Sequence, residues 1–258
     1  PDADGETERS RDREEGRMYR SKGFFFIALG LIASGVQAQD AAALQQAQRR
    51  GTELFELDQA ILAARQAGEE MRAFRRDEDI KGWIADTRGE AYLITFVRAG
   101  RDDAPVGRYR IAVGRTGKAL GEMEKLDDLP LDLREVSQFR ARLKAEGTAH
   151  EACSATYETL VLPEVSGEWS AYLMPRGAFS DVLLLGGSYR AQVSGDGNTV
   201  IAFQALASGC SVLPNPAEAE ALRFDDPAGG AVNELHAYIG KLAGKPLYVN
   251  SGGGSWVI

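Results

Sequence analysis

The sequence predicts an α+β fold in which helices pack on antiparallel sheet. Three observations point to this class. Apolar residues recur at helical spacing in three segments. Between those segments they alternate with a period of two. The strand-like runs form consecutive groups with the helical segments between them, so strands next to each other in the sequence can pair. Strands in this order pair as antiparallel meanders, with helices packed on the sheet. One continuous sheet and two side-by-side lobes both fit the pattern.

Residues 18–38 have the order of a cleavable signal peptide. A short basic leader after Met18 precedes an apolar run from Gly23 to Ala33, and Val36 and Ala38 are small residues at the two positions that signal peptidase reads. The apolar run is too short to cross about 30 Å of hydrocarbon as a helix. We therefore expect cleavage after Ala38, a periplasmic or secreted protein, and no stable membrane span after cleavage.

Residues 1–17 lack an initiating Met and are almost entirely polar. A signal peptide seldom follows such a leader, so this segment is interpreted as an upstream start or translated flanking sequence and is excluded from the fold. The expected mature chain, residues 39–258, is long enough to bury a core. The net charge of −8 argues against nucleic acid as a partner, because phosphate binding requires a basic surface.

The mature chain opens with an N-terminal helical segment, residues 39–78, in which a helix is predicted over roughly 41–76. Gly51 and Thr52 are expected to divide a loose first part from a packed second part. The packed part places five apolar side chains on one face, and these are expected to enter the core: Leu54, Leu57, Ile61, Ala64 and Met71.

Two further helices carry clear end signals. Asp132 and Glu135 form a variant of the capping box, Gly147 supplies a stop, and Val136, Phe139 and Leu143 form an apolar face between them. The last helix is predicted over 231–243 and ends before a glycine and a proline. Its apolar face consists of Val232, Leu235, Ile239 and Leu242.

The chain matches itself at an offset of 80 residues, which indicates an internal repeat. The paired Tyr109-Arg110 and Tyr189-Arg190 are the least common of its eight identities. The predicted order is a first β-meander over 79–130, a helix and second β-meander over 131–210, and a loop, helix and closing hairpin over 211–258. Asp196-Gly197 marks a tight turn inside the second meander.

Cys153 and Cys210 are the only cysteines. In an oxidising compartment, two cysteines are expected to form a disulfide. Closing the loop between them would stabilise the fold by roughly 4 kcal/mol in the chain-entropy model. A thiol nucleophile and a metal site that uses His150 are the alternatives, although one histidine and two distant cysteines form a poor ligand set.

Catalytic, metal-binding and phosphate-binding motifs do not occur, so no catalytic residue, metal or cofactor is predicted. The two histidines, His150 and His236, are interpreted as a loop residue and a half-buried helix residue. Paired aspartates that could act on sugars or peptidoglycan lie in evident loops, where solvated turn residues are the ordinary explanation. They occur at residues 102–103, 127–128 and 225–226.

Two features suggest ligand binding. Arg110 and Arg190 occupy equivalent outward positions of the repeat, where two guanidinium groups could face one anion. Trp83 and Trp169 recur at strand positions with other aromatic residues and could line a platform for sugar or peptide. The alternatives are surface ion pairs for the arginines and core packing for the tryptophans.

Three segments resemble secreted proteins of Gram-negative bacteria that have no assigned activity. They are ELDQA (56–60), TLVLPE (159–164) and GGSYRAQVSGDG (186–197). The resemblance spans most of the mature chain and implies export, but it implies no activity.

Two functions remain open on this basis. The first is a non-enzymatic periplasmic module that binds a protein, a peptide or an envelope component through its sheet. The second is an envelope-associated hydrolase that uses carboxylates.

Overall fold

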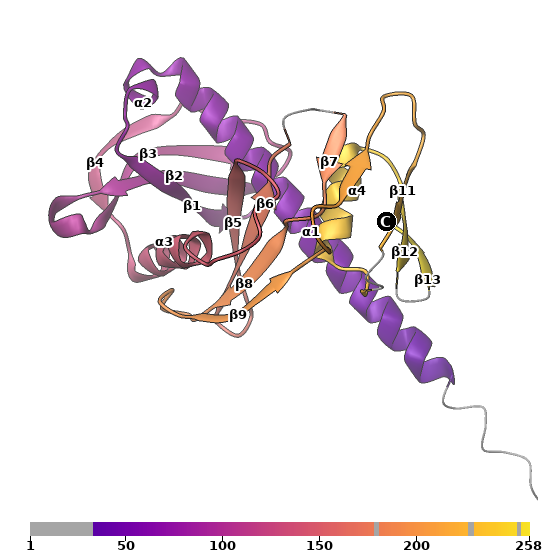
Figure 1. The fold of residues 1–258 in the computed structure, drawn as a ribbon. Helices are drawn as coiled ribbons and strands as arrows, with labels where there is room; N and C mark the ends of the chain where they lie inside the picture. The colour runs from indigo at the N-terminus through magenta and orange to yellow at the C-terminus, as the bar shows by residue number, and fades with distance from the viewer. Residues whose placement is uncertain (1–32, 178–180, 227–229, 252–253) are drawn as a thin grey trace, which may run out of the picture. The chain divides into compact units, whose positions relative to one another are not determined.

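The computed structural model describes residues 33–177, 181–226, 230–251 and 254–258 (Figure 1). The predicted leader and most of the predicted signal peptide lie outside these residues. The chain divides into two compact units, residues 1–39 and residues 40–258. Apart from the first turns of α1, which precede residue 40, the features described below belong to the second unit.

The fold is α+β, as predicted, with antiparallel sheets and several helices. The helices are α1 (Ala33–Glu70), α2 (Arg72–Arg75), η1 (Arg101–Asp103), α3 (Leu133–Glu146) and α4 (Glu234–Ala243). The first sheet contains β1 (Ile80–Arg88), β2 (Ala91–Ala99), β3 (Pro105–Gly114) and β4 (Glu124–Pro130). The second contains β5 (Tyr157–Pro163), β6 (Trp169–Pro175), β8 (Tyr189–Val193) and β9 (Val200–Ala205).

The remaining strands form two small sheets. β7 (Val182–Leu184) pairs with β10 (Val212–Pro214). β11 (Leu222–Asp225) runs parallel to β12 (Leu247–Ser251), and α4 connects them. β12 then forms a hairpin with β13 (Gly254–Val257), which confirms the predicted closing helix and hairpin.

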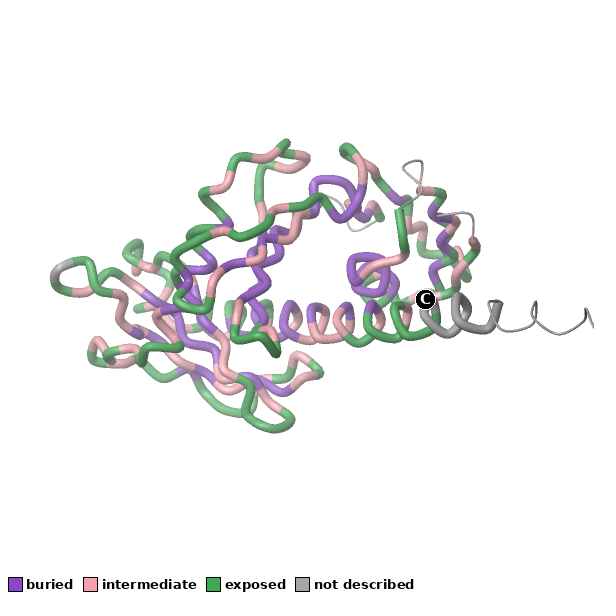
Figure 2. The backbone as a smooth tube through the Cα atoms, turned by 90° about the horizontal axis from the view of Figure 1, so that it is seen from below, coloured by how far each residue is buried: buried purple, intermediate pink, exposed green. Residues whose placement is uncertain are grey.

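Helix α1 forms part of the main core. Leu54, Leu57 and Ile61 are almost fully buried, against apolar side chains from both four-stranded sheets and from α4. The predicted division at Gly51 is wrong, because α1 continues through that residue. The buried positions of α1 appear in purple in Figure 2.

Helix α3 begins at the predicted capping box. The Asp132 side chain accepts from the Glu135 amide, and the Glu135 side chain accepts from the Asp132 amide. The helix lies over the outer strands of both sheets. The side-chain amide of Gln138 donates to the carbonyl of Ala85 in β1 at 3.1 Å and to that of Val161 in β5 at 3.3 Å.

The predicted apolar face of α3 is only partly the face that packs. Phe139 is buried, but Leu143 is 43% exposed and Val136 is half-buried. The packed face includes Gln138 and Arg142 instead, because their long side chains reach the strand-edge carbonyls that no neighbouring strand satisfies.

The two sheets repeat the same strand order, but their register differs from that implied by the offset of 80. Tyr92 pairs with Val113 in the first sheet, which implies that Tyr172 pairs with Val193 in the second. The structure pairs Tyr172 with Arg190. The connection from β6 to β8 leaves the second sheet and contains β7, which pairs with β10. In the first sheet, a short 3-10 turn joins β2 to β3. This difference between the two connections accounts for the changed register.

The changed register alters which side of the sheet each residue faces. Tyr109 lies in the main core beside α1, whereas Tyr189 packs on the cluster that includes Ala141 and Ala145 of α3. The two tyrosines therefore occupy opposite faces of their sheets, and the predicted equivalence of the neighbouring arginines does not hold.

Cys153 and Cys210 form the predicted disulfide. Cys153 precedes β5 and Cys210 follows β9, so the bond ties the beginning of the second sheet to its end. Gly187 packs directly against it, since a Cβ there would lie 2.5 Å from that of Cys153. Among the described residues, no helix is long and apolar enough to cross a bilayer.

Candidate functional site

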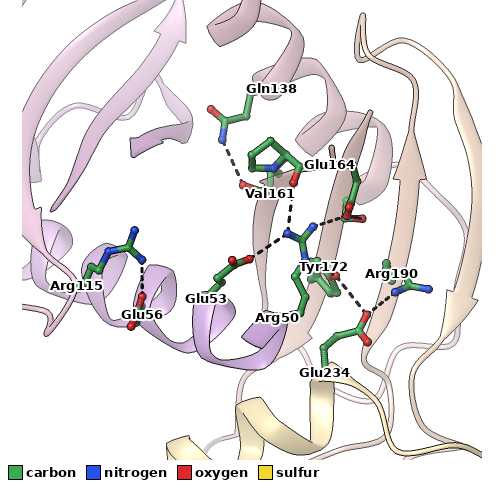
Figure 3. Close-up of polar contacts among 12 residues, drawn as sticks. Arg50, Glu53, Glu56, Arg115, Gln138, Val161, Glu164, Tyr172, Arg190 and Glu234 are labelled. Atoms are coloured by element: carbon green, nitrogen blue, oxygen red, sulfur yellow. Dashed lines mark hydrogen bonds and ion pairs between the residues drawn. The ribbon is translucent and has the colours of Figure 1, made fainter. Parts of the chain in front are cut away.

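A polar cavity of about 510 Å³ lies where α1, the β5–β6 hairpin, β8 and the start of α4 meet (Figure 3). This volume is within the range of small-molecule sites. Charged side chains of both signs and one tyrosine line the cavity: Arg49, Arg50, Arg190, Glu53, Glu164, Glu234 and Tyr172.

Arg50 is the most connected side chain of the cavity. Its guanidinium donates to the Tyr172 hydroxyl at 3.2 Å, to the carboxylate of Glu53 at 3.2 Å and to that of Glu164. Burial opposes the positive charge, but the contacts with Tyr172, Glu164 and Glu53 outweigh it and raise the pKa of Arg50. The side chain is therefore a fixed cation that ties α1 to the β5–β6 hairpin.

Glu234 also lines the cavity and contacts the same tyrosine as Arg50. It accepts from Nη1 of Arg190 at 2.6 Å and from the hydroxyl of Tyr172 at 3.3 Å. Burial, followed by the negative charge of Glu234, raises the pKa of Tyr172, so the phenol stays neutral and can donate. Burial lowers the pKa of Arg190, but Glu234 and Tyr172 more than offset this effect and the net shift is upward.

The start of α4 places Glu234 in the cavity. Asn233 caps the helix by accepting from the Leu235 amide at 3.0 Å, and its own amide group donates to the Leu206 carbonyl at 2.8 Å. Glu234 is thus the first helical residue, where the positive end of the helix dipole favours a carboxylate.

Gly51 allows α1 and α4 to approach closely beside the cavity. A Cβ at this position would lie 2.5 Å from the Ala237 Cβ and 2.5 Å from the Glu234 carbonyl oxygen, distances at which atoms overlap. The glycine that suggested a helix break is therefore a contact point between two helices. It brings Arg50 and Glu234 to neighbouring positions on the cavity wall.

The side chains of the cavity differ in how far their charges are neutralised. Arg49 is exposed and forms no ion pair within the described part of the chain. The side chains of Glu53 and Glu164 remain 47% and 33% exposed although both contact Arg50. The cavity therefore presents an unpaired cation next to two accessible carboxylates.

The structure brings one of the four predicted ligand-binding residues, Arg190, into the cavity. Arg110 instead donates to the Thr95 hydroxyl at 2.9 Å and pairs with Glu135 of α3. Among the described contacts, Arg110 and Arg190 share no partner.

Trp83 and Trp169 are buried, with 2% and 4% of their surface exposed. The indole of Trp83 donates to Glu158 at 3.0 Å, and that of Trp169 donates to the Gly195 carbonyl at 3.2 Å. Both indoles are thus held by groups of the protein itself, which is the core packing considered as the alternative.

Sequence reasoning missed Arg50, Glu164 and Glu234 as members of one site. They lie far apart in the chain and belong to no shared motif. Glu164 lies in a segment whose only sequence signal is its resemblance to secreted proteins, whereas Arg190 is also predicted to bind a ligand.

The other reactive side chains have structural roles. His236 is buried and its Nδ1 accepts from the Asn233 amide at 3.1 Å, which completes the cap of α4. The ring of His150 packs among Tyr157, Tyr189 and Phe203. In the described residues, no cluster of three or more His, Cys, Asp and Glu side chains has the arrangement of a metal site.

Comparisons with protein-family models, with curated proteins and with solved structures gave no match to this chain. The geometry of the cavity is therefore the basis for assigning a function.

Proposed function

We propose that the chain is an exported, non-enzymatic binding protein that holds a small zwitterionic molecule, such as an amino acid or a short peptide, in the polar cavity. One observation carries this proposal: an unpaired guanidinium, Arg49, lines the same cavity as the accessible carboxylates of Glu53 and Glu164. A ligand with a carboxylate and an ammonium group matches both kinds of partner.

The fixed charges support binding with little rearrangement. Arg50 and Glu234 are held by two or more contacts each, so their orientation exists before a ligand arrives. Preorganised polar groups reduce the conformational entropy lost on binding. The ligand carboxylate would contact Arg49 and Arg190, and the ammonium group would contact Glu53 and Glu164.

The same contacts favour binding over carboxylate-based hydrolysis, the alternative from the sequence. A general acid must be free to donate a proton to its substrate. The three carboxylates of the cavity are already bound by arginine side chains of the protein, since Glu53 and Glu164 contact Arg50 and Glu234 contacts Arg190.

The disulfide supports a site of action outside the cytoplasm, because such bonds persist in oxidising compartments. We propose that residues 18–38 direct export to the periplasm or the medium and are removed after Ala38. Intact-mass measurement of the exported protein would then show a chain that starts at Gln39. A chain that keeps residues 18–38 after export would contradict this part of the proposal.

Isothermal titration calorimetry of the purified protein tests the ligand class. The probes are alanyl-alanine of both chiralities, its N-acetylated form and its C-terminal amide. We expect the unmodified dipeptide of one chirality to bind, and each blocked form to bind at least about tenfold more weakly, because each loses one charged contact.

Two cavity variants and one control complete the test. Arg49→Gln and Glu53→Gln should each weaken binding, whereas Arg75→Gln removes an exposed arginine outside the cavity and should leave it unchanged. Equal binding of free and blocked peptides would overturn the zwitterion assignment. Release of alanine from the dipeptide would show an enzyme instead.

A further inference from the structure

A second concave surface lies at one end of the first sheet. Ile80, Arg98, Val106 and Pro130 pair in a row across β1, β2, β3 and β4, and the chain turns from Pro130 into α3 beside this row. The groove between the row and α3 has a volume of about 1280 Å³. This volume exceeds that of most small-molecule sites and is suited to a segment of polypeptide.

Helix α3 supplies the apolar wall of this groove. Leu133 is 91% exposed and Leu143 is 43% exposed, and Val136 between them is half-buried. Residues at these spacings lie along one side of a helix, so they form a ridge against which a second helix can pack. The opposite side of α3 already covers the outer strands of both sheets.

The charged rim of the groove is basic although the whole chain is acidic. Four cations line it, Lys81, Arg98, Arg101 and Arg140, against the two anions Asp103 and Asp128. The side chains of Lys81, Arg101 and Arg140 are exposed and form no ion pair with any residue that the structure describes. A net positive rim on a chain of charge −8 is a local feature that composition does not explain.

The backbone around the groove is also unusual. Asp103 and Asp128 have φ values of +60° and +47°, and they are the non-glycine residues with positive φ in the described part of the chain. Arg98 holds the Asp128 carboxylate with two hydrogen bonds, of 2.9 and 2.6 Å. Strained residues of this kind concentrate at binding surfaces, where the surrounding contacts maintain them.

From these observations we infer that the groove is a docking surface for an acidic amphipathic helix of a partner protein. The apolar face of the partner packs against Leu133, Val136 and Leu143, and its carboxylates lie over Arg101 and Arg140. Helix-in-groove recognition of this type combines apolar anchors with complementary charge at the rim. The inference is independent of the ligand cavity, which lies on other elements of the fold.

Fluorescence anisotropy with designed peptides tests the inference. The probe is a labelled peptide of about 15 residues with Leu at positions i, i+3, i+4 and i+7 and Glu on its other face. One control peptide has Lys in place of Glu, and another has Ser in place of Leu. We expect the acidic amphipathic peptide to bind and both control peptides to bind at least about tenfold more weakly.

Variants of the protein identify the surface. Leu133→Ser and the double variant Arg101→Glu/Arg140→Glu should weaken binding of the acidic peptide, and the double variant should gain binding of the Lys peptide. All three residues are exposed, so the fold should persist. Leu120→Ser and Arg75→Glu alter an exposed leucine and an unpaired arginine outside the groove, and should change neither affinity.

Three results would overturn the inference. The first is equal binding of the acidic and Lys peptides. The second is binding to phosphatidylglycerol vesicles that Leu133→Ser abolishes while the acidic peptide does not bind, which would assign the surface to a membrane. The third is a dimer in sedimentation experiments that Leu133→Ser dissociates, which would assign it to a second copy of the chain.

Discussion

The indole nitrogen of Trp83 donates a hydrogen bond of 3.0 Å to the carboxylate of Glu158, and this contact joins β1, at the edge of one sheet, to β5, at the edge of the other. Glu158 is 2% exposed and also forms ion pairs with Arg65 of α1 at 2.8 Å and with Arg142 of α3 at 3.6 Å. One buried carboxylate thus links both sheets to the helices on either side of them.

Removal of this charge should strongly destabilise the fold. Glu158→Gln leaves the Arg142 guanidinium, which is 8% exposed, without its carboxylate partner in the second sheet, and breaking a buried pair costs about 3–5 kcal/mol. The control Glu146→Gln removes a partly exposed partner of the same arginine and should cost below about 1 kcal/mol. Urea unfolding measures both free energies, and equal losses would contradict the role given to Glu158.

The close helix crossing predicts opposite effects of two glycine substitutions. Gly51→Ala forces overlap with Ala237 and should destabilise by about 1–3 kcal/mol, even though alanine favours a helix. Gly240→Ala in α4 meets its nearest atoms at 3.6 Å and should be neutral or stabilise by up to about 1 kcal/mol. Thermal unfolding compares the two variants, and a stabilised Gly51→Ala would show that the helices do not meet there.

Loss of the disulfide should lower stability without changing the fold under mild conditions. The double variant Cys153→Ser/Cys210→Ser releases a loop of 57 residues, worth about 4 kcal/mol in the chain-entropy model. Urea unfolding of the variant and of the reduced parent chain should give similar losses. Alkylation of the oxidised protein without reductant should leave its mass unchanged, and two modified cysteines would exclude the bond.

His236 should make stability depend on pH. Burial lowers the pKa of its ring below the ordinary value of 6.5, although Asp226, the Asn233 amide and Glu234 act in the opposite direction. Above pH 6.5 the ring is neutral in both the folded and the unfolded chain, so the titration of His236 does not lower the free energy of unfolding. Below that pH the unfolded chain gains a proton that the folded ring resists, so the free energy of unfolding falls towards the folded pKa.

The variant His236→Gln separates titration from capping, since a glutamine at this position of a capping box can still accept from the Asn233 amide. Urea unfolding between pH 7.5 and pH 5 should therefore show a shallower loss of stability in the variant than in the parent chain. Identical pH slopes would mean that the His236 ring keeps its ordinary pKa in the fold.

The features predicted correctly from the sequence depend on residues that are neighbours in the chain, on the periodicity of apolar residues, or on the presence of two cysteines. The capping box at Asp132 and Glu135 is local, and so is the turn at Asp196 and Gly197, where the glycine has φ +76°. The disulfide followed from parity and the expected compartment. The fold class followed from the change of hydrophobic period, which does not require knowledge of which strands pair.

The features that the sequence could not predict depend on distant contacts. Gly51 predicts a break because glycine disfavours helices, but the partner helix that requires this glycine lies about 180 residues further along the chain. Glu158 lies between Tyr157 and Thr159 at the start of a strand, where a charged residue is expected to face solvent. Its burial becomes evident only when α1, α3 and β1 surround it. The cavity likewise forms only in the folded chain, where Arg50, Glu164 and Glu234 come together from distant parts of the sequence.

The bridge that α3 makes between β1 and β5 has a consequence for association of the chain with itself. Both strands are sheet edges, and exposed edges are templates on which a second molecule can add a strand. Gln138 and Arg142 occupy carbonyls of both edges, so a single helix blocks two sites of intermolecular β-pairing. Detachment of α3 alone would open both edges together, and aggregation would begin from that partly unfolded state.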